Sequence, residues 1–160
     1  MLKNATKTKS VLSTSLIVIF FMLGLILLMA VIMGIPYIFN NIKDTNTIVH
    51  GIGAFVIGIT YFMMIISLLE IVSSSKVNIF IKSNVKQFKR IGCLLLINLG
   101  IDYVFSIIYG VSGMRFVDLA PGVFITPSMC IYFIAGLLCF VIADAFDQAI
   151  TIKEENEFTV

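Results

Sequence analysis

The sequence predicts an all-α integral membrane protein, a four-helix bundle that crosses the bilayer four times. Of its 160 residues, 59% are hydrophobic and 12% are charged, and the mean hydropathy is +1.08. Soluble domains carry about 25% charged residues, and a chain this short would need a polar surface to dissolve in water. Four apolar stretches reach the roughly 20 residues that a membrane-crossing helix requires. Because these runs are continuous, they do not show the alternation that is typical of transmembrane β-strands.

The predicted spans follow one another along a single transmembrane domain of residues 1–160. The first has no charge between Lys9 and Lys43, and its run is longer than the apolar part of a signal peptide. We expect Pro36 to end it, because proline removes a backbone donor and clashes with the preceding turn. Pro121 fits the first turn of the fourth span, where a missing N–H costs least. The four spans are residues 11–35, 48–72, 91–111 and 121–143.

Lysine and arginine are distributed unevenly between the two sides of this topology. Nine of the eleven lie in the N-terminal segment, the loop between spans two and three, and the C-terminal tail, and only Lys43 and Arg115 lie on the other side. Positive residues are retained on the cytoplasmic side. We therefore expect a multi-pass membrane protein with both termini in the cytoplasm.

The basic loop, residues 76–90, carries apolar residues at spacings of four, four and three: Val77, Ile81, Val85 and Phe88. This pattern predicts an interfacial amphipathic helix between spans two and three. Its cations would bind anionic lipid headgroups or form part of a docking surface for a partner. They are Lys82, Lys86, Lys89 and Arg90.

The tail, residues 144–160, is acidic and emerges on the same side as the basic loop. One interpretation is a solvated tail that improves solubility. Our hypothesis is that the tail packs against the basic loop and completes the docking surface, since opposite charges attract over about 8 Å in physiological salt. The tail residues assigned to that surface are Glu154, Glu155, Asn156 and Glu157.

Asp102 lies within the third span, where a charged side chain costs about 2.5–3.5 kcal/mol. It is about 16 Å from the predicted start of that helix, close to the midplane. Matching depths across the predicted spans places Thr60, Tyr61 and Tyr132 near it, and Asn98 lies one turn away on the same helix. The cluster is interpreted either as hydrogen-bonding glue between helices or as a site that responds to a proton or ligand.

Small residues at spacings of four predict close helix contacts. Ala30 with Gly34, and Ala54 with Gly58, form such pairs.

The sequence contains no catalytic constellation that we can identify. Cys93, Cys130 and Cys139 lack the spacing of a redox or metal motif, and His50 is the single histidine. Phosphate-binding glycine loops and hydrolase motifs are also absent. We therefore expect no enzymatic activity, no metal and no cofactor, and a net charge of +2 does not suggest direct nucleic-acid binding.

Two segments resemble an uncharacterised family of small bacterial four-span membrane proteins, classed as a domain of unknown function. Residues 84–92, N-V-K-Q-F-K-R-I-G, are similar to the family's entry into its third span. Residues 154–160, E-E-N-E-F-T-V, are similar to its E-E-N-D-L-T-V tail, with Glu157 in place of Asp and Phe158 in place of Leu. The resemblance implies four helices in a bacterial cytoplasmic membrane, but no activity. Family members are often encoded beside an Xre-type helix-turn-helix regulator, which implies a link to transcription control.

Two functions follow as hypotheses. The first is a non-enzymatic accessory or regulatory protein whose cytoplasmic face docks a soluble partner, with a helix-turn-helix transcriptional regulator as the best candidate. The alternative is a small transporter, or a subunit of one, built around Asp102. The transporter would require a homo-oligomer, because carriers commonly contain more spans than four.

Overall fold

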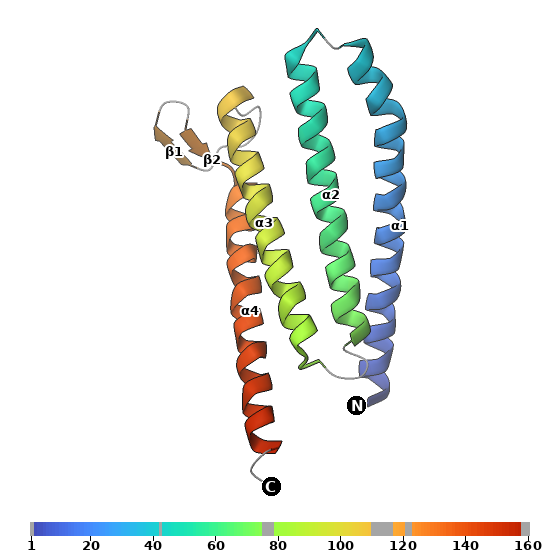
Figure 1. The fold of residues 1–160 in the computed structure, drawn as a ribbon, viewed down its shortest axis with the longest axis vertical. Coiled ribbons are helices and arrows are strands. Elements are labelled where there is room, and N and C mark those ends of the chain that lie inside the picture. Colours follow the sequence, from blue (N-terminus) through green and yellow to red (C-terminus); the bar gives the residue numbers. More distant parts are fainter. Residues whose placement is uncertain (1, 42, 75–78, 110–116, 121–122, 158–160) are drawn as a thin grey trace. The chain divides into compact units, whose positions relative to one another are not determined.

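The computed structural model describes residues 2–41, 43–74, 79–109, 117–120 and 123–157. All four helices are long and apolar enough to cross a membrane, which confirms the predicted multi-pass, four-helix class (Figure 1). A two-stranded hairpin separates the last two helices. The elements in order are α1 (Leu2–Asn40), α2 (Thr45–Ser74), α3 (Lys82–Tyr109), β1 (Val117–Ala120), β2 (Val123–Ile125) and α4 (Pro127–Glu157).

Burial differs from that of a soluble protein, because polar side chains are buried while many large apolar side chains are exposed. Ser67, Asn84 and Asn98 are 0%, 1% and 2% exposed, whereas Phe21 and Val141 are 69% and 67% exposed. In water, so large an apolar surface would drive aggregation. In hydrocarbon there is no such penalty, and polar side chains are the groups that gain from facing protein. The pattern therefore matches a lipid-exposed molecule.

The chain divides into two compact units, Met1–Val77 and Asn78–Val160. In the first unit, α1 packs on α2 after a short turn in which the Asp44 amide donates to the carbonyl of Asn41 (2.9 Å). Phe20 stacks on Phe62, with ring centroids 4.8 Å apart. Aromatic stacking and close packing therefore hold this helix pair together.

The expectation that Pro36 ends the first helix is wrong, because α1 continues to Asn40 with Pro36 inside it. Proline removes one helical hydrogen bond. The helix beyond it is retained, since the Asn41 amide still donates to the carbonyl of Tyr37 (3.2 Å). In a bilayer, helical backbone satisfies its own polar groups, so continuing the helix costs less than ending it in hydrocarbon.

The second unit is built on the α3–α4 pair, whose backbones approach at two glycines. A Cβ placed on Gly92 would lie 3.1 Å from the carbonyl oxygen of Gly136 and 3.1 Å from the ring of Phe140. Small residues permit this kind of approach between membrane helices. Near the start of α3, Val85 packs with Ala143 and Ile150 of α4.

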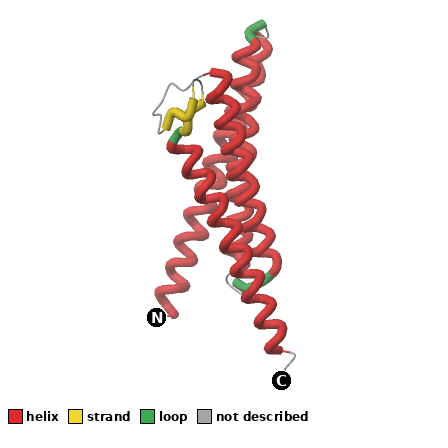
Figure 2. The backbone as a smooth tube through the Cα atoms, turned by 90° about the vertical axis from the view of Figure 1, so that its left-hand side faces the viewer, coloured by secondary structure: helices red, strands yellow, loops and turns green. Residues whose placement is uncertain are grey.

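The β1–β2 hairpin was not predicted. Val117 pairs with Ile125 and Asp118 with Phe124, in antiparallel register. β2 lies against α3, and Figure 2 shows the hairpin beside the start of α4. As a result α4 begins at Pro127, six residues later than the predicted Pro121.

Candidate functional site

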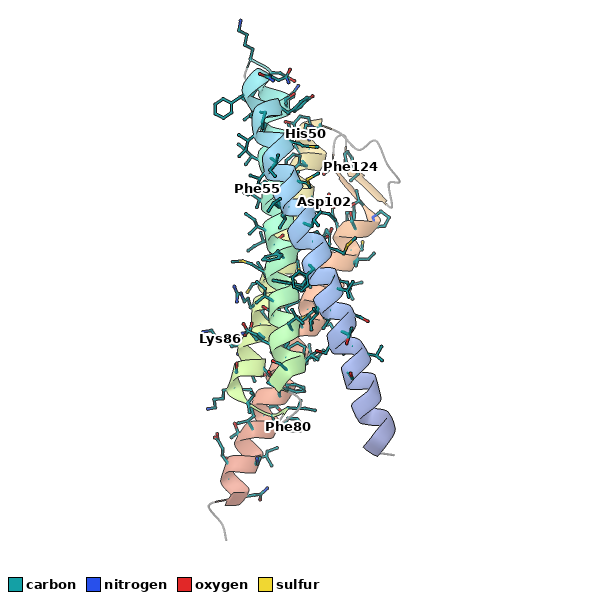
Figure 3. All side chains as sticks on the ribbon, turned by 90° about the vertical axis from the view of Figure 1, so that its right-hand side faces the viewer. His50, Phe55, Phe80, Lys86, Asp102 and Phe124 are labelled. Carbon is teal, nitrogen blue, oxygen red and sulfur yellow. The ribbon has the colours of Figure 1, made fainter. Side chains whose placement is uncertain are left out.

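The cations predicted for the basic loop lie on the first turns of α3. Lys82, Lys86, Lys89 and Arg90 are all exposed, and Figure 3 shows Lys86 projecting outward. They share this end of the helix with two buried polar residues, Asn84 and Gln87. The side-chain amide of Asn84 donates through Nδ2 to the carbonyl of Ile79 (2.7 Å), which anchors the entry into the helix.

Here the structure differs from the prediction of a separate interfacial helix. From Lys82 onward the basic segment is continuous with the span, and residues 76–78 lie outside the described residues. Val85 is 5% exposed and packs on α4, while the Phe88 ring meets the Phe146 ring edge to face at 5.4 Å. The apolar face of this segment therefore contacts protein, because α4 runs alongside it and supplies an apolar surface.

The acidic tail continues α4 as a helix instead of folding back over the basic segment. Figure 1 shows α4 extending past the start of α3. Glu154, Glu155 and Asn156 are exposed, and Glu157 is the last helical residue. Its side chain and residues 158–160 lie outside the part of the chain that the structure describes.

Together these residues form what we call the charged end of the α3–α4 pair. It comprises Lys82, Lys86, Lys89 and Arg90 of α3 and Glu154, Glu155 and Asn156 of α4. Ile150 packs beside Val85, so the acidic residues begin about one helical turn further along the axis. Along α4, Ile152 lies between Ile150 and Glu154, and this apolar side chain is 59% exposed. The charged end thus presents a cationic surface on α3 and a mainly acidic one on α4, where Lys153 and the apolar Ile152 are also exposed.

The second candidate is the polar cluster around Asp102. Ser128 Oγ donates to Asp102 Oδ2 at 2.6 Å, and Thr126 Oγ1 lies 3.4 Å from the same oxygen. Thr126 caps α4, because its hydroxyl oxygen accepts from the Met129 amide (3.3 Å). Asp102 and Phe124, which follows the hairpin turn, lie at the same end of this helix pair (Figure 3).

The donors and acceptors of this cluster form one directed chain. The Ser128 hydroxyl hydrogen points at Asp102, so in the 2.8 Å contact between Thr126 and Ser128 the threonine is the donor. The chain then runs from the Met129 amide through Thr126 and Ser128 to the carboxyl group. A carboxyl group beside a helix N-terminus also gains from the helix dipole. The arrangement links α3 to the start of α4.

The other residues predicted around Asp102 lie on α3, α4 and α2. Asn98 is buried one turn before Asp102 on α3, and Tyr132 is half-buried one turn after Ser128 on α4. Thr60 and Tyr61 belong to the other unit, where the buried Thr60 hydroxyl donates to the carbonyl of Ile57 (2.7 Å). The prediction therefore named the acid but missed Thr126 and Ser128.

A signal for the missed residues is present in the sequence. Threonine followed by proline and serine is a favourable N-cap and first turn, because threonine accepts from the backbone and proline has no amide to satisfy. Recognising Thr126-Pro127-Ser128 as the cap would have placed both hydroxyls at the start of the fourth helix.

The described residues include acidic, histidine and cysteine side chains that could in principle bind a metal ion or form disulfides. Among them, no three His, Cys, Asp or Glu side chains cluster closely enough to hold a metal ion. Cys93, Cys130 and Cys139 are free thiols.

The fold and these sites define a multi-pass membrane protein with four long apolar helices. A family model described as "Protein of unknown function (DUF2975)" matches residues 35–160. The chain belongs to this family, which confirms the resemblance to an uncharacterised family. Comparison with curated proteins and with solved structures gives no match. The matched region contains both the charged end and the Asp102 cluster.

Proposed function

We propose that this chain is a non-enzymatic regulatory protein of the cytoplasmic membrane whose charged end binds a soluble protein partner. The observation that carries the proposal is the extension of α4 past the start of α3, with exposed Glu154, Glu155 and Asn156. Short helices in water are marginal unless they pack on something. A partner that covers these turns would stabilise them.

The chemistry of the charged end specifies what that partner needs. Ile152 offers an apolar anchor with Glu154 and Glu155 close by, and protein interfaces commonly place charged residues around such an anchor. The α3 cations would face acidic groups of the partner. The distribution of lysine and arginine supports a cytoplasmic position for this end.

A helix-turn-helix transcriptional regulator is our candidate partner. The DNA-binding surface of such a protein is basic, because most of its affinity comes from phosphate contacts. That surface would complement the acidic turns of α4. Binding there would keep the regulator from DNA, and the membrane protein would release it in response to a change of membrane state.

The Asp102 cluster supports a structural rather than a chemical role for the acid. Its carboxyl group accepts a hydrogen bond from Ser128, which lies beside the α4 cap at Thr126, and general acid–base chemistry would need a second group positioned at the reacting atom.

Site-specific photo-cross-linking in native membranes tests the proposal. A photoreactive amino acid replaces Glu155 in one variant and Leu138, which is 58% exposed on the same helix, in the matched control. We expect position 155 to capture a soluble protein that position 138 does not capture. Mass spectrometry identifies the product, and a DNA-binding regulator among the products would establish the class of partner.

Charge reversal supplies the second arm. The double variant Glu154→Lys with Glu155→Lys should abolish capture from a photoreactive residue at Ile152, if complementary charge selects the partner. Cross-links from position 155 that contain only lipid or membrane proteins, together with capture from position 152 that charge reversal leaves unchanged, would rule out docking at the charged end.

A further inference from the structure

A cavity of about 900 Å³ lies between α1 and α2, at the end where residues 41–44 join the two helices. Small residues are among those that line it: Ala30 and Gly34 on α1, and Gly51 and Ala54 on α2. A Cβ placed on Gly34 would meet no atom within 4 Å, whereas one on Gly58 would lie 2.5 Å from Leu27 Cδ2. The close contact expected at the Ala54–Gly58 pair is therefore present at Gly58, while Ala30, Gly34 and Ala54 line an open space, which we call the α1–α2 groove.

The α1–α2 groove has the depth of one lipid leaflet. Its α1 wall runs from Leu27 to Ile38, a rise of about 16 Å, and half of a hydrocarbon core is about 15 Å. The groove is open at the side, since Ile35, Ile52 and Phe55 in its walls are 49%, 57% and 42% exposed. A hydrocarbon chain could enter laterally from the bilayer and lie against these walls.

The rim of the α1–α2 groove is polar and lies at the turn between the two spans. It consists of Asp44, Asn46, Thr47 and His50, and Figure 3 shows His50 further along α2 toward the turn than Phe55. Asp44 Oδ1 accepts from the Asn46 amide (3.2 Å) and Oδ2 from the Thr47 hydroxyl (2.5 Å). These bonds, together with the nearby His50, hold the pKa of Asp44 below its ordinary value, so this carboxyl group is ionised at neutral pH.

We propose that the α1–α2 groove binds one membrane phospholipid with an ammonium head group, of the phosphatidylethanolamine type. One acyl chain lies along Ala30, Gly34 and Ala54, and the ammonium group pairs with the Asp44 carboxylate. Asn46 and His50 carry N–H groups that can donate to the lipid phosphate. An anionic phosphatidylglycerol head group lacks the cation and meets a like charge at Asp44. The site is independent of the proposed docking function, because it lies in the other unit.

Native mass spectrometry of the full chain, delipidated in detergent, tests this site. The probes are phosphatidylethanolamine and phosphatidylglycerol with identical acyl chains. We expect one tightly retained lipid and about fivefold tighter binding of phosphatidylethanolamine, the scale of one partly exposed ion pair. Asp44→Asn, which keeps the ability to cap α2, should abolish this preference while the chain site still binds.

Filling the α1–α2 groove is the second arm. Gly34→Phe places a ring where the structure has open space and should weaken binding of both lipids at least about tenfold. Gly100→Phe is the matched control, since a Cβ on Gly100 of α3 also meets no atom within 4 Å. It should leave both affinities unchanged. Equal lipid binding by the two phenylalanine variants would overturn the site, and equal binding of the two lipids by the unmodified chain would overturn the head-group assignment.

Discussion

Asp102 shows how a carboxyl group is accommodated inside an apolar helix. Its Oδ2 accepts from Ser128 at 2.6 Å, and Ser128 in turn accepts from Thr126, which caps α4. Each hydroxyl donates once and accepts once, so no member of the chain lacks a partner. Hydrogen bonds from side chains at the start of α4 therefore offset the free-energy cost of placing a carboxyl group in the span.

Replacing Ser128 with Ala should destabilise the α3–α4 pair by about 1 kcal/mol, because the shortest hydrogen bond to Asp102 is lost. Thr151→Ala is the matched control on the same helix. Its exposed hydroxyl donates only to the carbonyl of Asp147 within α4 (3.1 Å), so we expect a change within about 0.5 kcal/mol. Denaturant unfolding in detergent measures both. Equal stability of the two variants would show that the Asp102 cluster contributes nothing to the pair.

Asp44 should make the stability of the α1–α2 unit depend on pH in acid. Its pKa is lowered from 3.8 in the folded chain, mainly by the Thr47 hydroxyl, so the folded state favours the ionised form. That contribution is fully present above the unfolded value of 3.8 and is lost as the pH falls through the lower folded pKa.

The matched comparison is Asp44→Asn, which caps the helix about as well but does not titrate. Thermal unfolding in detergent between pH 6 and pH 2 should show the unmodified chain losing more stability in acid than the variant. Parallel pH profiles would contradict the assignment. This measurement requires no lipid and is separate from the test of the α1–α2 groove.

At the scale of elements, the sequence predicted the existence of the helices better than their ends. Four runs of about 20 apolar residues leave no soluble alternative, and each became a helix. The ends depend on local hydrogen bonds that hydropathy does not report. α1 continues past Pro36, where it was expected to end. α4 is capped by Thr126, although it was expected to begin at Pro121.

A boundary error in α3 accounts for the error at the Asp102 site. α3 begins at Lys82, nine residues before the predicted start at Ile91, and Asp102 lies seven residues before its end at Tyr109, at the level of the first turn of α4. Depth matching from Pro121 placed Tyr132 at the level of Asp102, whereas the structure places Ser128 there. The acid itself was predictable because a charge in an apolar run is conspicuous. Its partners were not, since they depend on the register between two helices.

Gly92 is the position where the α3–α4 pair should be most sensitive to size. A Cβ there would meet the carbonyl oxygen of Gly136, which belongs to a helix backbone and cannot rotate away. Gly92→Leu should therefore destabilise the pair by about 1–3 kcal/mol or separate the helices. Gly100→Leu, on an open face of the same helix, should be tolerated. Unfolding in detergent compares them, and similar losses in both would mean that the close approach is not what matters.

At the scale of the whole molecule, the charge distribution links topology to function. Nine of eleven cationic residues lie in segments that a four-span chain places on one side, and those segments include the cations of the charged end. A cytoplasmic partner can reach the charged end only if that side is cytoplasmic. Membrane sidedness is therefore the property on which the docking proposal depends most directly.

Cysteine accessibility should establish this orientation. In a chain whose three native cysteines are replaced by Ala, Lys43→Cys and Lys153→Cys place thiols at exposed positions on opposite predicted sides. A membrane-impermeant maleimide added to intact cells should label position 43 at once and position 153 only after the membrane is opened, since cationic loops remain in the cytoplasm. The reverse pattern would put the charged end outside, where it could not meet a transcriptional regulator, and would end the docking proposal. The lipid site proposed for the α1–α2 groove does not depend on that outcome, because the groove would then open into the cytoplasmic leaflet.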